Sequence, residues 1–281
     1  MVIVTDKEYF LEKRLVSKLD LIADRVTRPN PKKDASIIIE GGEGEGKSTL
    51  AGACGYYLAY KTNRPFSNKN FFFKLKPLIE FAQSTENQII ILDEPGLEGL
   101  STDWYNRANK DLVRLLMLCR KKRHIFIFCF TKFYKFSDYI TVERSLALIH
   151  VYSRRNIEPG RFVYIPKKRL ERLVMLWRSS RKRGYKTLNS FRGSFPDVLD
   201  KLIDIKAYEA EKDKAIAAIG EVQLTDNQIA RRELHILKGR LARVKFPINN
   251  FEELAQNLST SRANFSRWLV YPTEREDKLE D

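Results

Sequence analysis

One stretch of the chain has both the residue types and the spacing needed to hold a chain of phosphates. Residues 36–49 are SIIIEGGEGEGKST, so a short β-branched run leads into the pattern G-x-x-x-x-G-K-S, and helix-forming residues follow. Glycines let successive backbone N–H groups point at an anion without a Cβ in the way. The first turn of a helix adds unpaired N–H groups and the positive end of its dipole. A strand, this loop and a helix in that order predict a phosphate-binding loop rather than a glycine-rich hairpin or linker.

The residues of this loop predict a site for ATP and Mg²⁺. Lys47 is expected to reach the β- and γ-phosphates, and the Ser48 hydroxyl is expected to ligate Mg²⁺. The residues expected to surround the phosphates are Gly41, Gly42, Glu43, Gly44, Glu45, Gly46, Lys47, Ser48 and Thr49.

A pair of carboxylates ends the next strongly apolar stretch. Residues 88–92 (QIIIL) predict a buried parallel strand, and Asp93 and Glu94 follow it directly. Asp93 is expected to hold Mg²⁺ together with Ser48, and Glu94 to orient or deprotonate an attacking water. An isolated acidic pair would suggest only a solvated turn. After a complete phosphate loop, the pair favours hydrolysis over the phosphoryl transfer of a small-molecule kinase.

The periodicity of the surrounding residues predicts the elements that would position these groups. Strands are expected at 70–74, 124–130, 146–152 and 162–165, and helices at 75–84, 104–123 and 137–145. The phosphate loop then follows the first strand of an α/β domain, the carboxylates the third, and Thr131 the fourth.

This order of elements resembles the additional-strand, catalytic-glutamate division of P-loop NTPases. The resemblance implies a three-layer αβα fold with a mostly parallel sheet in the order 5-1-4-3-2. It also implies that Thr131 is a polar sensor facing the γ-phosphate, where many members of the division carry Gln or Asn.

Residues 93–154 further resemble the FtsK–HerA superfamily and the Zot-type ATPases of phages. The resemblance rests on the acidic pair, a long helix, the basic turn CRKKRH at 119–124, an apolar strand and a short helix. It implies a motor of a virus, plasmid or other mobile element that acts on DNA as a homo-oligomer, with a hexameric ring as one form. An arginine donated by a neighbouring subunit would complete such a site, and Arg144 is the first candidate, followed by Arg154 and Arg155. The alternative is a non-motor protein in which ATP controls DNA binding, as in a regulator or a replication or transposition helper.

The charge of the chain points to a polyanionic partner. The 281 residues carry a formal net charge of +15, and basic residues are concentrated between residues 154 and 192. Tyr164, Trp177, Tyr185 and Phe191 are interleaved with them, and aromatic rings can stack on bases while cations neutralise phosphates. Arg181, Lys182 and Arg183 are therefore predicted to contact nucleic acid, although a solvated helix face is the usual explanation of such a run.

A second candidate for DNA contact lies near the C-terminal end. Residues 251–269 resemble a helix-turn-helix, with Ala255 where two helices cross and apolar residues at the packing positions. Its second helix would turn polar side chains toward the groove of double-stranded DNA: Arg262, Asn264, Ser266 and Arg267. Two packed helices without a partner are the alternative.

These features predict three parts: an ATPase core at 1–165, a basic helical extension at 166–222, and a small all-α helix-turn-helix domain at 223–281. Cys54, Cys119 and Cys129 each lie in an apolar segment and are expected to be buried thiols. The sequence shows no membrane-spanning run and no signal peptide, which predicts a cytoplasmic protein.

Overall fold

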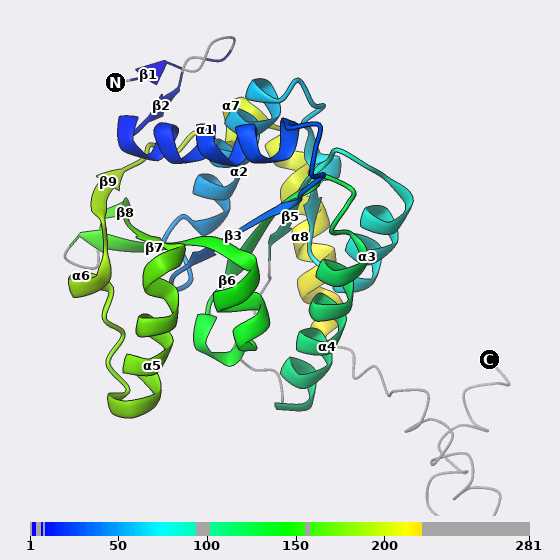
Figure 1. Cartoon of the computed structure of the whole chain (residues 1–281). Coiled ribbons are helices and arrows are strands. Elements are labelled where there is room, and N and C mark those ends of the chain that lie inside the picture. The colour runs from blue at the N-terminus through cyan, green and yellow to red at the C-terminus, as the bar shows by residue number, and fades with distance from the viewer. Residues whose placement is uncertain (1, 4–6, 8, 94–101, 155–157, 221–281) are drawn as a thin grey trace, which may run out of the picture. The chain divides into compact units, whose positions relative to one another are not determined.

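Apolar strands alternate with amphipathic helices along the chain, and together they build a layered α/β fold (Figure 1). The computed structural model describes residues 2–3, 7, 9–93, 102–154 and 158–220. Contacts divide the chain into one compact unit, Met1–Ala218, and a second, Ile219–Asp281. The described elements belong to the first unit, apart from the end of the helix that finishes at Gly220.

The central sheet has seven strands in the order β4-β5-β6-β3-β7-β8-β9. Their bounds are β3 Ala35–Glu40, β4 Phe71–Phe72, β5 Ile89–Asp93, β6 Ile125–Phe130, β7 Ser145–Arg154, β8 Glu158–Pro166 and β9 Phe191–Ser194. The first five strands of that order run parallel, and β8 and β9 are added antiparallel beside β7. A separate pair, β1 (Val2–Ile3) and β2 (Phe10–Leu11), forms a two-stranded sheet.

Numbered along the chain, the five parallel strands β3 to β7 lie in the order 5-1-4-3-2, which confirms the predicted topology. Strand β6 therefore separates β3 from β5 and pairs with both. The carboxyl ends of these three strands meet at one edge of the sheet, where ligands bind in open α/β folds.

The central strands are buried on both faces, as expected for a parallel sheet. Alternate residues enter different cores: Ile37 and Ile39 lie in one, and Ile38 in the other. Strand β6 contributes a ladder of stacked rings to the second core, with 5.8 Å between the ring centroids of Phe126 and Phe128 and 5.7 Å between those of Phe128 and Phe130. Such rings bury large apolar areas and fix the sheet against its helices.

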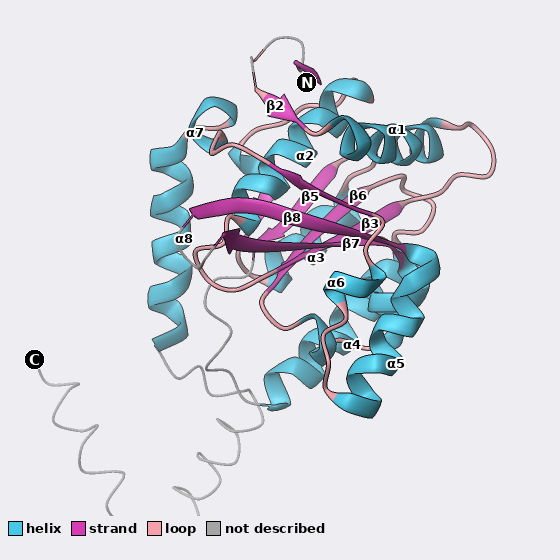
Figure 2. Cartoon of the chain, turned by 90° about the vertical axis from the view of Figure 1, so that its left-hand side faces the viewer, coloured by secondary structure: helices cyan, strands magenta, loops and turns pink. Residues whose placement is uncertain are grey.

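The helices cover the two faces (Figure 2). One core contains residues of α1 (Lys13–Thr27), α2 (Lys47–Lys61), α7 (Leu199–Leu202) and α8 (Ile205–Gly220). The other contains residues of α3 (Leu75–Ser84), α4 (Thr102–Leu118), α5 (Leu170–Ser180) and α6 (Tyr185–Leu188). Short turns of 3-10 helix lie at η1 (Asn68–Asn70), η3 (Phe133–Lys135) and η5 (Lys167–Arg169). None of the helices in the described ranges is long and apolar enough to cross a bilayer.

One predicted element differs in the structure. The helix expected at 137–145 is a single π-helical segment, η4 (Tyr139–Arg144). Residues 166–218 of the expected basic extension belong to the same unit as the sheet, which β9 extends, and the predicted division of the chain stays a prediction. The predicted helix-turn-helix at 251–269 lies outside the described residues.

Candidate nucleotide site

The predicted phosphate loop connects the end of β3 to the start of α2. Gly44 and Gly46 have φ of 72° and 87°, in the left-handed region that favours glycine. A Cβ on Gly41 would lie 2.5 Å from Val151 Cγ2 and 2.7 Å from the Val151 carbonyl oxygen, so this position has no room for a side chain. No side chain caps α2 at Gly46, and its first N–H groups remain available to an anion.

Lys47 is folded back onto the loop that precedes it. Its Nζ donates hydrogen bonds to the carbonyl oxygens of Gly41 at 3.0 Å and Gly42 at 2.6 Å, and the residue is 9% exposed. A buried ammonium satisfied by two carbonyls of the loop is placed to exchange those contacts for phosphate oxygens.

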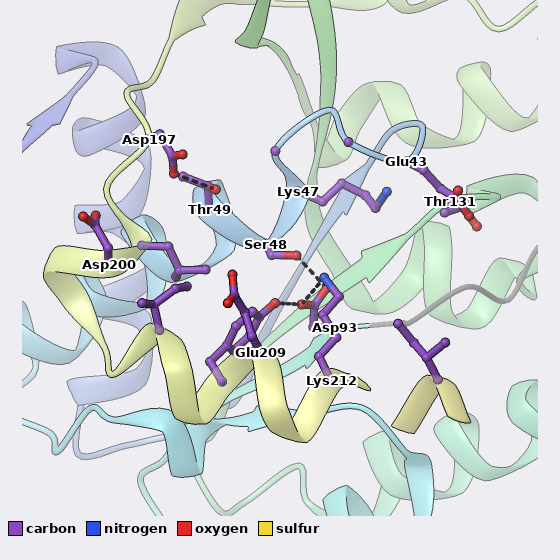
Figure 3. A pocket seen from close by; sticks show the side chains of 16 residues that line it. Glu43, Lys47, Ser48, Thr49, Asp93, Thr131, Asp197, Asp200, Glu209 and Lys212 are labelled. Atoms are coloured by element: carbon purple, nitrogen blue, oxygen red, sulfur yellow. Dashed lines mark hydrogen bonds and ion pairs between the residues drawn. The ribbon is translucent and has the colours of Figure 1, made fainter. Parts of the chain in front are cut away.

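Ser48, in the first turn of α2, and Asp93, the last residue of β5, lie together (Figure 3). The Ser48 hydroxyl donates to Asp93 Oδ1 at 3.0 Å. A hydroxyl beside a buried carboxylate offers the oxygen ligands that Mg²⁺ prefers. The two residues expected to hold the metal are therefore brought together.

The second oxygen of the Asp93 carboxylate is also engaged. Tyr208 of α8 donates its hydroxyl hydrogen to Asp93 Oδ2, and Lys212 Nζ lies 3.8 Å from the same oxygen. Burial, reinforced by the adjacent Asp93 charge, raises the pKa of Tyr208, so its hydroxyl remains a protonated donor.

Thr131 follows β6 and lines the same pocket. Its Oγ1 is buried and has no hydrogen-bond partner among the described residues. Buried hydroxyls nearly always have a partner, so one without a partner beside a phosphate loop fits a group that meets a ligand.

The pocket has a volume of about 780 Å³. Part of its lining is the phosphate loop with Asp93 and Thr131, and the rest comes from the C-terminal part of the unit: Asp197, Leu199, Asp200, Ile205, Tyr208, Glu209, Lys212 and Ile216. Sequence reasoning missed this second part of the lining. The only signal for it is the spacing of Tyr208 and Lys212, which are four residues apart and so share one face of a helix.

Arg144, the first candidate for an arginine donated between subunits, is instead part of the protein interior. It forms an ion pair with the buried Asp34 and donates to the Leu116 carbonyl oxygen at 3.1 Å. It directly precedes β7, whose first residue Ser145 pairs with Ser36 near the start of β3, so it lies at the end of the sheet opposite the phosphate loop. These contacts hold the Arg144 side chain within its own subunit, and its donation to a neighbouring subunit stays a prediction.

Three of the remaining predicted groups lie outside the described part of the chain. They are Glu94, Arg155 and the recognition-helix residues Arg262, Asn264, Ser266 and Arg267.

Arg181, Lys182 and Arg183 form an exposed basic turn between α5 and α6. The Arg181 guanidinium lies 5.6 Å from the centroid of the Trp177 ring, which stacks on Tyr134 with 4.4 Å between centroids. Tyr134 donates its hydroxyl hydrogen to the Arg183 carbonyl oxygen at 2.8 Å. The turn is therefore fixed on the η3 segment that follows β6.

Three aromatic residues of the basic segment cannot stack on bases. Tyr164, Tyr185 and Phe191 are at most 7% exposed and pack in the two cores. Their spacing among the basic residues reflects the packing of β8, α6 and β9. Trp177, the fourth aromatic residue of the segment, is only partly buried and lies beside Arg181.

Comparison with known proteins assigns no family to the chain. No protein-family model matches it, and no curated protein matches it in sequence. Among solved structures, an arginine-to-alanine variant of RuvB from Thermotoga maritima aligns over 94% of this chain and 89% of its own, with 11% identity and a TM-score of 0.33. A TM-score this low supports no conclusion about fold or function, so both rest on the topology and the site described above.

Proposed function

We propose that this protein binds ATP with Mg²⁺ and hydrolyses it, and that it binds DNA. The observation that carries the first part is the convergence of Lys47, Ser48, Asp93 and Thr131 on one pocket at the carboxyl ends of β3, β5 and β6. The phosphates would lie along the loop from Gly41 to Thr49, with Lys47 on the β- and γ-phosphates.

The roles of the remaining side chains follow from their positions. When bound, Mg²⁺ would neutralise charge on the phosphate oxygens. Ser48 and Asp93 would hold it, and the Thr131 hydroxyl would donate to the terminal phosphate. Glu94, next to Asp93 in the sequence, would orient and deprotonate the attacking water.

The DNA-binding part of the proposal rests on charge. The net charge is +15, and the exposed turn Arg181–Arg183 presents three adjacent cations. The more specific form is a ring-forming motor that acts on double-stranded DNA for a virus, plasmid or other mobile element. A nucleotide-controlled switch is the second candidate, and the contact of α8 with Asp93 favours it, because that contact ties a distant helix to the metal site.

Substitution of Glu94 tests the hydrolytic role. We expect Glu94→Gln to bind ATP as the unchanged protein does but to hydrolyse it roughly 10²- to 10⁴-fold more slowly, because general-base catalysis contributes a factor of that order. Lys47→Ala is the matched control for binding and should lose ATP affinity. Hydrolysis by Glu94→Gln at the unchanged rate would contradict the assignment and favour a switch.

The oligomeric mass of the protein and the dependence of its ATPase rate on DNA distinguish the ring-forming motor from the nucleotide-controlled switch. The ATPase rate should be measured with and without duplex DNA while mass is recorded by light scattering. A DNA-stimulated ring supports the motor. A monomer whose ATPase rate is the same with and without DNA rules out the motor.

A further inference from the structure

We propose that α8 competes with Mg²⁺ for Asp93, so that Tyr208 and Lys212, which engage the carboxylate, must release it when Mg²⁺ and ATP bind. This inference rests on the proposed function, because it concerns the regulation of the same site.

The contacts around Asp93 occupy both of its carboxylate oxygens. Oδ1 accepts from Ser48 at 3.0 Å, Oδ2 accepts from the Tyr208 hydroxyl, and Lys212 Nζ lies 3.8 Å from Oδ2. The side chain of Asp93 is only 3% exposed, so neither carboxylate oxygen faces solvent. A helix 115 residues further along the chain thus satisfies the carboxylate that the metal requires.

Charge makes these contacts competitive rather than supportive. The Lys212 ammonium already neutralises Asp93 from a position close to the one a divalent cation would take. Mg²⁺ binds oxygens at about 2.0–2.1 Å in near-octahedral geometry and is repelled by a cation a few ångströms away in a partly buried site. Lys212 must therefore move away when the metal enters.

The way α8 is held is compatible with such a movement. The start of its first turn is held through Asp204, the residue before the helix: Asn68 Nδ2 donates to the Asp204 carbonyl oxygen at 2.7 Å, and Asn68 Oδ1 accepts from the Asp204 N–H at 3.0 Å. Beyond that turn, Tyr208 and Ala215 are the only buried residues between 205 and 217, all of which the structure describes. A helix with few buried contacts separates from its unit at low cost in free energy.

Tyr208 is the main attachment of the helix. Its ring lies edge-on to Phe71 and to Phe73, each with 5.3 Å between centroids, and its hydroxyl reaches Asp93. The ring contacts are independent of the hydroxyl, so Tyr208→Phe keeps the packing and removes only the hydrogen bond to the carboxylate.

The direction in which these substitutions change Mg²⁺ affinity shows whether Tyr208 and Lys212 compete with the metal or help Asp93 to bind it. If Tyr208 and Lys212 merely oriented Asp93, their removal would weaken Mg²⁺ binding. If they compete, Tyr208→Phe should lower the Mg²⁺ concentration needed for half-saturation by roughly tenfold or more, since a hydrogen bond to a charged group is worth at least that factor. Lys212→Gln should lower it as well, because it removes a cation that lies 3.8 Å from the same carboxylate oxygen.

The test uses the full chain, a slowly hydrolysed ATP analogue and a Mg²⁺ titration followed by calorimetry. The matched control is Lys214→Gln, which removes the same charge from the same helix at a side chain that is 73% exposed and pairs with Glu211. We expect this control to behave as the unchanged protein. An unchanged or raised Mg²⁺ requirement in both Tyr208→Phe and Lys212→Gln overturns the inference while leaving the proposed function intact. Absence of analogue binding in every variant overturns both.

Hydrogen exchange gives a readout that does not depend on affinity. Amides of residues 205–217 should exchange faster when the analogue and Mg²⁺ are added to the unchanged protein, and the analogue in EDTA should have a smaller effect. Equal protection of the helix in all three states would overturn the inference.

Discussion

At the scale of single residues, Thr131 shows how a buried hydroxyl without a hydrogen bond, which destabilises the fold, can indicate a functional group. Its hydroxyl is buried and lacks a partner among the described residues, and it lies in the pocket beside Asp93. We predict that Thr131→Val leaves the melting temperature unchanged or raises it, because the substitution removes an unsatisfied polar group at nearly constant volume. Hydrolysis should fall by roughly 10- to 100-fold through loss of one hydrogen bond to a charged oxygen. Thermal denaturation and a steady-state phosphate assay check the two halves, and an unchanged rate would remove Thr131 from the site.

Two glycines of the phosphate loop differ in the reason why a side chain is unfavourable at their position. Gly41 faces the backbone and side chain of Val151, whereas Gly44 has φ of 72° and no atom within 4 Å of the position that a Cβ would take. We predict that Gly41→Ala costs about 1–3 kcal/mol of unfolding free energy through overpacking, and Gly44→Ala about 1 kcal/mol through backbone strain. Chemical denaturation of both variants measures the difference. A larger loss in Gly44→Ala would show that the strained turn, not the contact with β7, limits the loop.

The residues whose places in the fold could be predicted from sequence are those whose positions depend on local chain geometry. Lys47 and Ser48 follow directly from the strand–loop–helix pattern, and Asp93 from the end of a buried strand. The ion pair of Arg144 with Asp34 could not be predicted, because the two residues lie 110 positions apart and the local pattern gives no sign of the pair. Tyr208 was missed for the same reason.

At the scale of elements, His124 joins the starts of β5 and β6 to α3. Its Nδ1 accepts from the Gln88 N–H at 3.1 Å, so its Nε2 carries the hydrogen that is donated to the Ala82 carbonyl oxygen at 3.0 Å. Burial, helped by the nearby charges of Lys122 and Arg64, lowers the pKa of His124 below its ordinary 6.5. The folded protein therefore holds this ring neutral.

This arrangement predicts a loss of stability in acid. Below pH 6.5 the His124 side chain is protonated in the unfolded chain but stays neutral in the folded chain. The unfolding free energy therefore falls by about 1.4 kcal/mol per pH unit as the pH drops from 6.5 toward the pKa of His124 in the folded protein. Above pH 6.5 the unfolding free energy does not depend on this group. His124→Asn, which cannot titrate, should be less stable at neutral pH but lack this component of the slope. Urea denaturation between about pH 7.5 and about pH 5 measures both. Parallel slopes for the two proteins would rule out His124 as the source.

The elements of the parallel core could be predicted because their signals are strong and local. Unbroken apolar runs mark β3 (37–39), β5 (89–92) and β6 (125–130), and α3 has the bounds Leu75–Ser84 that its periodicity predicts. Strand β9 was not predicted. Its four residues FRGS carry Arg and Gly, and it forms a strand only because β8 offers an open edge. That edge is a property of the fold, which local sequence does not contain.

At the scale of the whole molecule, the two regions proposed to contact DNA should contribute differently. We predict that a chain ending at residue 222 binds duplex DNA without sequence preference, and that its affinity falls steeply with salt, because phosphate contacts through Arg181–Arg183 release counterions. Base-edge contacts, which give selectivity, would be lost with residues 223–281.

Charge reversal of Arg181, Lys182 and Arg183 in the full chain is the complementary variant. It should weaken binding to all sequences and flatten the dependence on salt. Filter binding or anisotropy with a random duplex and a selected site, over a salt series, measures both variants. Full site preference in the shortened chain would show that residues 251–269 are a packed helix pair rather than a reader of bases.

The distance along the chain between Asp93 and Tyr208 also has a consequence during synthesis. A ribosome adds roughly 5–20 residues per second, so the 115 residues between the two partners take roughly 6 to 23 s to make. All five parallel strands of the sheet precede α8 in the chain and can associate during that time. For several seconds of every synthesis, a nascent chain therefore presents the Asp93 carboxylate to cellular magnesium before the tyrosine that engages it has been translated.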